Sequence, residues 1–177
     1  MIRRAVEGDI PGVCAIYARI HDLEEAGTGK TGWRRGVYPT ERTAREALAE
    51  GDLFVDEREG RVVAAARINR IQVPEYALAS WQFHAPEDKI MVLHTLAVHP
   101  EASGRGVGTG FVAFYERYAL ESGCPFLRMD TNQINAPARA LYARLGYREA
   151  GVVPCPFNGL GVVQLVCLEK ALDGARP

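Results

Sequence analysis

Residues 92–109 read Val-Leu-His-Thr-Leu-Ala-Val-His-Pro-Glu-Ala-Ser-Gly-Arg-Gly-Val-Gly-Thr. The apolar stretch Leu93–Val98 predicts a strand, and the residues after it predict a glycine-rich turn that opens onto an amphipathic helix. Glycine occupies every second position from Gly104 to Gly110, so the backbone can bend tightly and approach a ligand closely. The first turn of a helix has unpaired N–H groups and a partial positive charge. The stretch therefore predicts an anion site suited to a pyrophosphate.

Two other phosphate-binding loops are excluded by the residues that they require. A Walker loop needs a lysine before its final Ser or Thr, and this turn has none. A dinucleotide fingerprint needs a third glycine where this chain has Thr109 or Phe111, depending on the frame. The remaining pattern, x-Gly-Arg-Gly-x-Gly after a strand, resembles the coenzyme A pyrophosphate loop of the GCN5-related N-acetyltransferase (GNAT) family. A plain glycine-rich connection between a strand and a helix is the alternative.

Residues 130–147 carry the resemblance further. Asn135 suits the N-cap of a helix, Pro137 its first turn and Gly146 its C-terminal end. The family has a segment of the form Asn-x-x-Ala-x-x-Leu-Tyr-x-x-x-Gly-Phe/Tyr. This chain matches it at Asn135, Ala138, Leu141, Tyr142, Gly146 and Tyr147. With two segments in the right order, the chain is identified as a member of the family, over roughly residues 1–10 and 50–170.

Composition excludes several other classes of protein. The chain has 177 residues, 47 % of them hydrophobic and 24 % charged, which suits one soluble globular domain. A net charge of −1 without a basic block argues against a nucleic-acid partner. No stretch approaches the roughly 20 apolar residues of a membrane span, so no membrane partner is expected. The acidic residues Glu7 and Asp9 follow the first residues where a signal peptide would be apolar, so we expect a cytoplasmic protein.

The cysteines give no sign of a metal site. Cys14, Cys124, Cys155 and Cys167 form no Cys-x-x-Cys pair, so neither zinc nor any other metal is expected. Buried free thiols in a reducing cytosol are the simplest interpretation, and a catalytic cysteine is the less favoured alternative.

The predicted elements follow the order β-α-α-β-β-β-α-β-α-β-β. Helices are expected after an Asp9 cap, from a Thr40 cap through Leu48, and over 107–121 and 136–145. Strands are expected over 2–6, 53–56, 62–68, 90–98, 126–131, 147–151 and 162–169. This order implies an α/β fold: one mixed, mostly antiparallel sheet of six to seven strands with helices on both faces, in a single domain over 1–172. Residues 173–177 are expected to be a frayed tail.

The resemblance implies where acetyl-CoA would bind as cosubstrate. In the family fold the fourth and fifth strands splay apart, and the pantetheine arm enters the gap like an added strand. The residues implied to contact acetyl-CoA are Leu96, Ala97, Val98, Ser103, Gly104, Arg105, Gly106, Val107, Gly108, Thr109, Asn135, Ala138 and Tyr142. Ser103 stands where the family usually has Gln or Arg, so a long polar side chain is missing there.

Acetyl transfer from a thioester to an amine needs a base, an oxyanion donor and an acid for the departing thiolate. The family places a tyrosine at Tyr142, which is the candidate acid; a core tyrosine is the alternative. His94 is the candidate base, and the N–H of Leu96 is the candidate oxyanion donor. The surrounding strand also resembles that of arylalkylamine N-acetyltransferases, which carry a second histidine where this chain has Val92. A strand histidine satisfied by a neighbouring hydrogen bond is the alternative for His94.

The acceptor site is expected in the loops 21–40, 70–88 and 153–161. Asp22, Glu24 and Glu25 could attract a cationic amine, or could form a solvated face. Aromatic surface, which could equally belong to the core, is offered by Trp33, Tyr38, Tyr76, Trp81, Phe83 and Phe157.

The sequence thus predicts an acetyl-CoA-dependent N-acetyltransferase. Its acceptor is expected to be the primary amine of a small molecule or amino-acid derivative, acetylated directly in a ternary complex. A protein or peptide N-acetyltransferase and a non-catalytic coenzyme A-binding module are the alternatives. A homodimer is a further option, with Val162–Leu168 as a candidate interface strand.

Overall fold

The computed structural model describes residues 1–157 and 159–172. Seven strands in this part of the chain form one sheet in the order β1-β2-β3-β4-β5-β7-β6. The β4–β5 pair is parallel, and the other neighbouring pairs are antiparallel. The strands are β1 (Ile2–Arg4), β2 (Leu53–Arg58), β3 (Arg61–Asn69), β4 (Ile90–Val98), β5 (Phe126–Asn132), β6 (Arg148–Pro156) and β7 (Val162–Ala171). The expected fold class is confirmed.

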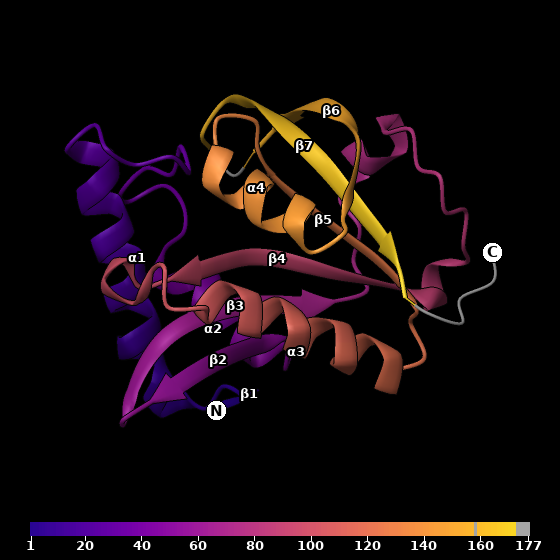
Figure 1. Cartoon of the computed structure of the whole chain (residues 1–177). Helices are drawn as coiled ribbons and strands as arrows, with labels where there is room; N and C mark the ends of the chain where they lie inside the picture. The colour runs from indigo at the N-terminus through magenta and orange to yellow at the C-terminus, as the bar shows by residue number, and fades with distance from the viewer. Residues whose placement is uncertain (158, 173–177) are drawn as a thin grey trace.

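Four α-helices in the described residues cover the two faces of the sheet (Figure 1). They are α1 (Ile10–Glu25), α2 (Glu41–Ala49), α3 (Val107–Glu121) and α4 (Ala136–Arg144). The buried side chains of α3 and α4 pack in one core cluster with alternate residues of the strands. Those of α1 and α2 pack in a second cluster on the opposite face. The connection between β3 and β4 supplies Tyr76 to a third cluster, with Ile90, Val92 and Phe126.

The expected helix and strand positions agree with the structure to within a few residues, except at the end of the chain. Strand β6 runs on to Pro156, well beyond the expected residue 151. Strand β7 pairs with β5 from Leu165 onward and with β6 from Val162, so most of the candidate interface strand 162–168 lies inside the sheet and not at its edge. No helix among the residues described is long and apolar enough to cross a membrane. The expected frayed tail, 173–177, lies outside the described residues.

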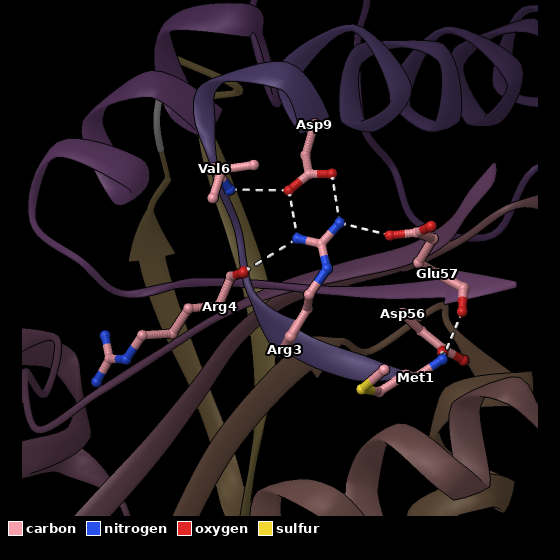
Figure 2. Close-up of polar contacts among 7 residues, drawn as sticks. All are labelled: Met1, Arg3, Arg4, Val6, Asp9, Asp56 and Glu57. Carbon is pink, nitrogen blue, oxygen red and sulfur yellow. Dashed lines mark hydrogen bonds and ion pairs between the residues drawn. The ribbon is translucent and has the colours of Figure 1, made fainter. Parts of the chain in front are cut away.

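Asp9 occupies the N-cap position of α1 as expected, but its side chain makes no capping hydrogen bond to that helix. Asp9 instead accepts a hydrogen bond from the Val6 N–H at 2.8 Å and binds the Arg3 guanidinium through both carboxylate oxygens, at 2.7 and 2.9 Å. Figure 2 shows Arg3 between Asp9 and Glu57, with the N-terminal ammonium beside Asp56. Both carboxylate oxygens are thus engaged by charge-assisted hydrogen bonds to one guanidinium. The carboxylate therefore fixes β1 against the following turn.

Candidate active site

Strands β4 and β5 form a fork. Their parallel pairing begins at Ile90 and Phe126 and ends at the Leu93–Met129 pair. Beyond it the two strands diverge toward their C-terminal ends (Figure 1). Within the described part of the chain, residues 96–98 of β4 therefore have no partner on β5. A strand edge with free N–H and C=O groups can accept an extended ligand as an added strand.

A β-bulge in β4 lies where the fork opens. Thr95 has a φ of 53°, and the register between β3 and β4 shifts at this point. A left-handed conformation is unfavourable for a β-branched residue, and such strain is characteristic of functional sites. The Thr95 hydroxyl hydrogen-bonds that of Tyr38, which holds the bulge in place. The bulge turns the rest of β4 relative to its start.

The glycine-rich turn leads from β4 into α3 and has the geometry of an anion site. Gly106, the N-cap of α3, has a φ of 75°, and Gly104 has a φ of 74°. The N–H groups of Val107–Thr109 in the first helical turn have no partner among the residues that the structure describes. A Cβ at Gly108 would lie 3.2 Å from Leu141 Cδ2, so glycine there lets α3 pack closely against α4. Together these features suit a bound phosphate group.

Tyr142 of α4 reaches the fork from the α3 face. Its side chain is 6 % exposed, and its Oη has no hydrogen-bond partner among the described residues. In the same part of the chain, only Tyr147 Oη is both fully enclosed and unpartnered, so Tyr142 Oη is open to the cavity that it lines. Burial, with a smaller contribution from the charge of Asp130, raises the pKa of Tyr142 well above its usual value. The phenol is thus protonated at neutral pH and can donate a hydrogen bond.

A protein-family model, described as the acetyltransferase (GNAT) family, matches residues 17–147 of the chain. The match includes the fork, the glycine-rich turn and α4. The chain belongs to the GNAT family of acetyltransferases. The identification made from residues 92–109 and 130–147 is therefore confirmed.

Solved structures of acetyltransferases share the fold along the whole chain. A GNAT-family acetyltransferase from Streptococcus agalactiae has a TM-score of 0.79 at 22 % identity, covering 98 % of this chain and 95 % of that one. Ribosomal-protein-alanine N-acetyltransferase from Brucella melitensis has a TM-score of 0.69 at 24 % identity, covering 97 % and 99 %. The protein yncA from Salmonella typhimurium, solved with its cofactor acetyl-CoA, has a TM-score of 0.67 at 19 % identity, covering 100 % and 96 %.

A cavity of about 410 Å³ lies at the fork of this acetyltransferase. The cavity brings together several of the residues singled out in the sequence. Those that line it are His94, Leu96, Asn135, Ala138 and Tyr142, with the aromatic residues Trp33, Tyr38 and Phe157. The rings of Tyr38 and Phe157 meet edge to face with centroids 5.0 Å apart. Asn135 also caps α4 as expected, accepting a hydrogen bond from the Ala138 N–H at 3.2 Å.

His94 lies on β4 directly after the last β4–β5 pair. Its Nε2 is 3.0 Å from Oδ1 of Asn69, the last residue of β3. Burial, followed by the positive charge of Arg67, lowers the pKa of His94 to about 4. The imidazole is therefore neutral at pH 7 and a weak proton acceptor.

Other predicted acceptor residues lie outside the cavity. Asp22 and Glu25 bind Arg35 at 2.6 and 2.7 Å, because the loop after α1 folds back onto that helix. Glu24 accepts hydrogen bonds from the N–H and hydroxyl of Thr31. The three acids thus stabilise the 21–40 loop. The aromatic rings of the 70–88 connection, Tyr76, Trp81 and Phe83, pack in the third core cluster instead.

Ser103 and Arg105 of the turn are exposed side chains. A phosphate group at the turn could bind their backbone N–H groups, or the Arg105 side chain if it folds back over the turn.

Three residues of the site were not singled out in the sequence. Asp130 lines the cavity from β5, Asn69 lines it from β3, and Thr95 forms the bulge. Of these three, only Asp130 had a signal in the sequence, because it is a carboxylate directly after the apolar residues of a predicted strand. The roles of Asn69 and Thr95 depend on the pairing of β3 with β4.

Proposed function

We propose that this protein transfers an acetyl group from acetyl-CoA directly to the primary amine of a small molecule or amino-acid derivative, in a ternary complex. One observation carries the proposal: a single cavity adjoins the free edge of β4, the end of α4 with Tyr142, and the aromatic side chains of the acceptor loops. The two substrates can thus meet without an intermediate carrier. We also propose that residues 1–172 form one N-acetyltransferase domain.

The chain's own backbone suits the coenzyme. The unpaired N–H groups of Val107–Thr109 would hold the pyrophosphate at the start of α3, and residues 96–98 would pair with the pantetheine arm. When bound, acetyl-CoA supplies an activated thioester. The Leu96 N–H, just past the bulge, is our candidate donor to the developing oxyanion.

Tyr142 is the proposed general acid. Its buried phenol keeps its proton at neutral pH and opens onto the cavity, so it can protonate a departing thiolate. His94 is proposed as a neutral group that accepts a hydrogen bond from the amine and orients it. Its low pKa makes it too weak a base to hold the amine's proton at pH 7.

The shape of the acceptor side favours a small molecule over a peptide. Trp33, Tyr38 and Phe157 wall the cavity, and a volume of about 410 Å³ is in the range of small-molecule sites. A non-catalytic coenzyme A-binding module would have no use for Tyr142 or His94 at the cavity.

Thermal-shift titrations with acetyl-CoA, coenzyme A and ATP test the first step. We expect the two coenzyme A species to raise the Tm with concentration and ATP to leave it unchanged. Primary amines are then screened by thiol release, and initial rates are measured with both substrates varied. Intersecting double-reciprocal lines are expected for a ternary complex. Parallel lines would contradict direct transfer, and stabilisation by ATP alone would contradict the proposed ligand.

A further inference from the structure

Asp130 occupies a particular place at the fork. It is the first β5 residue beyond the Leu93–Met129 pair, as His94 is on β4. Strand β5 remains paired with β7 there, through Asp130 and Cys167, so the backbone of Asp130 is held firmly. Its side chain lines the cavity that also contains Tyr142 and His94. Asp130 is therefore a carboxylate placed between the coenzyme side and the acceptor side of the site.

One oxygen of this carboxylate is held and the other is free. Tyr76 Oη donates a hydrogen bond to Asp130 Oδ2 at 2.7 Å. Asp130 Oδ1 has no hydrogen-bond partner within residues 1–157 and 159–172, and it is not among the fully enclosed polar atoms there. Oδ1 is thus open to the cavity. A donor that enters the cavity can bind it without displacing a protein group.

Within residues 1–157 and 159–172, no cation forms an ion pair with Asp130, and Arg128 of the same strand donates to Gln72 Oε1 and the Phe83 carbonyl instead. The titratable groups that interact electrostatically with the Asp130 carboxylate are Glu75 and Tyr76 of the β3–β4 connection, Tyr38, Tyr142, Cys155 and Cys167. The phenols and thiols are neutral at pH 7, and Glu75 adds negative charge. Arg67 and Arg42 also line the cavity, but Arg67 pairs with Glu50 and Asp52, and Arg42 lies 3.8 Å from Glu46. A positively charged ligand would supply the missing partner.

Resting on the proposed function, we propose that Asp130 is the catalytic base: its Oδ1 receives the acceptor as a primary ammonium ion and takes one proton from it. The N–H bond breaks, an O–H bond forms on Oδ1, and the electron pair remains on nitrogen for attack on the thioester carbonyl. The proton leaves the carboxylic acid for water in the open cavity. The acceptor class is therefore amines that are ammonium ions in solution, not anilines or amides.

The acid–base properties of Asp130 suit this role. Burial raises the pKa of Asp130 to about 6, against the hydrogen bond from Tyr76, which lowers it. Catalysis by a base is most efficient when its pKa lies near the working pH. Asp130 is thus the better proton acceptor at the fork, while His94 is free to orient the amine.

Thiol-release kinetics with n-butylamine, 2-phenylethylamine, phenylalanine amide and cadaverine test the inference. Asp130→Asn should lower kcat/KM for the amine at least 100-fold while the Kd of acetyl-CoA stays within threefold. In Tyr76→Phe the acidic limb of the kcat/KM–pH profile should move to higher pH, since the hydrogen bond that lowers the pKa is lost. Asp88→Asn, which removes an exposed carboxylate, is the matched control and should stay within twofold of wild type.

The outcomes separate the two proposals. If the wild type acetylates an amine and Asp130→Asn stays within fivefold of it, the role of Asp130 is refuted and the proposed function stands. If Asp130→Asn does not fold, as judged by its Tm, an unmoved acidic limb in Tyr76→Phe refutes that role instead. If the wild type binds acetyl-CoA and acetylates none of the amines, the proposed function is refuted, and the role of Asp130 with it.

Discussion

The Nε2 of His94 donates a hydrogen bond to Oδ1 of Asn69 over 3.0 Å. The direction of this bond follows from the other contacts of Asn69. Its Nδ2 donates to Asp52 Oδ2 at 2.8 Å, and its Oδ1 also accepts from the Ile71 N–H at 2.9 Å. Because Oδ1 can only accept, the proton of the neutral imidazole lies on Nε2, and Nδ1 has a lone pair. Asn69 is thus a positioning residue for His94.

Replacing Asn69 with Leu should release the imidazole while keeping a side chain of similar size. One hydrogen bond contributes about 1 kcal/mol, so we expect kcat/KM for the amine to fall about five- to tenfold. The KM of acetyl-CoA should not change, because Asn69 pairs with Val92 and lies away from residues 96–98 of β4. Steady-state kinetics check this. If Asn69→Leu has no further effect in a His94→Gln background, Asn69 acts through His94. A fall in acetyl-CoA affinity instead would argue for a general disturbance of the fork.

Tyr142→Phe should slow turnover without weakening coenzyme binding. The aromatic ring still packs on Tyr147, whose centroid lies 5.9 Å away, so the fold is kept. Loss of a general acid typically costs about 10²–10⁴ in rate. We expect kcat to fall by that range while the Kd of acetyl-CoA, measured by calorimetry, stays within threefold. Full turnover in this variant would show that a group other than Tyr142 protonates the thiolate.

Gly106→Ala should weaken acetyl-CoA binding. A left-handed alanine costs about 1–2 kcal/mol, so the free turn will relax to another conformation and must be restored on binding. We expect the Kd of acetyl-CoA to rise about tenfold. Gly60 has nearly the same φ, 74°, in the β2–β3 turn. Gly60→Ala is therefore the control, with a lower Tm and an unchanged Kd.

Asp130→Asn should stabilise the free protein at neutral and higher pH. The folded-state pKa of about 6 exceeds the ordinary value of 3.8, so the charged carboxyl destabilises the fold above pH 6 and not below pH 4. A gain of 1 kcal/mol raises the Tm of a protein this size by about 2–4 °C, and we expect at least that at pH 8. The difference from wild type should vanish as the pH falls from 6 to 4. A variant less stable than wild type at pH 8 would show that Asp130 is compensated in the fold.

Asp9→Ala should destabilise the N-terminal part of the sheet. The Arg3 guanidinium, the main partner of Asp9, lowers the pKa of that carboxyl, so its contribution is present above pH 4 and is lost as the pH falls through the lowered value. Hydrogen bonds to charged groups contribute about 1.5–3 kcal/mol, and at about 2–4 °C per kcal/mol this predicts a Tm lower by about 3–12 °C at pH 7. Arg19→Ala, which breaks an exposed pair with Asp22, should leave the Tm near that of wild type.

The sequence by itself determined the elements and the residues of the proposed coenzyme side. Strand 90–98 and helix 107–121 were predicted with the bounds that the structure has, because apolar periodicity and glycine conformation act over a few neighbouring residues. The proposed anion site at Val107–Thr109 is local for the same reason. Its N–H groups are unpaired in any helix that begins there.

Only the tertiary structure decided the proposed acceptor side. Tyr76 and Asp130 are 54 residues apart in the chain, and Asn69 and His94 are 25 apart. These contacts depend on the register of β3 with β4 and on where the β4–β5 pairing ends. The sequence around the bulge at Thr95 has no glycine or asparagine that would predict a left-handed residue. The bulge is stabilised by Tyr38 from a distant loop. The pKa values of His94 and Asp130 likewise arise from burial, because removing water changes the free energy of a charge in a way that no neighbouring residue in the chain specifies.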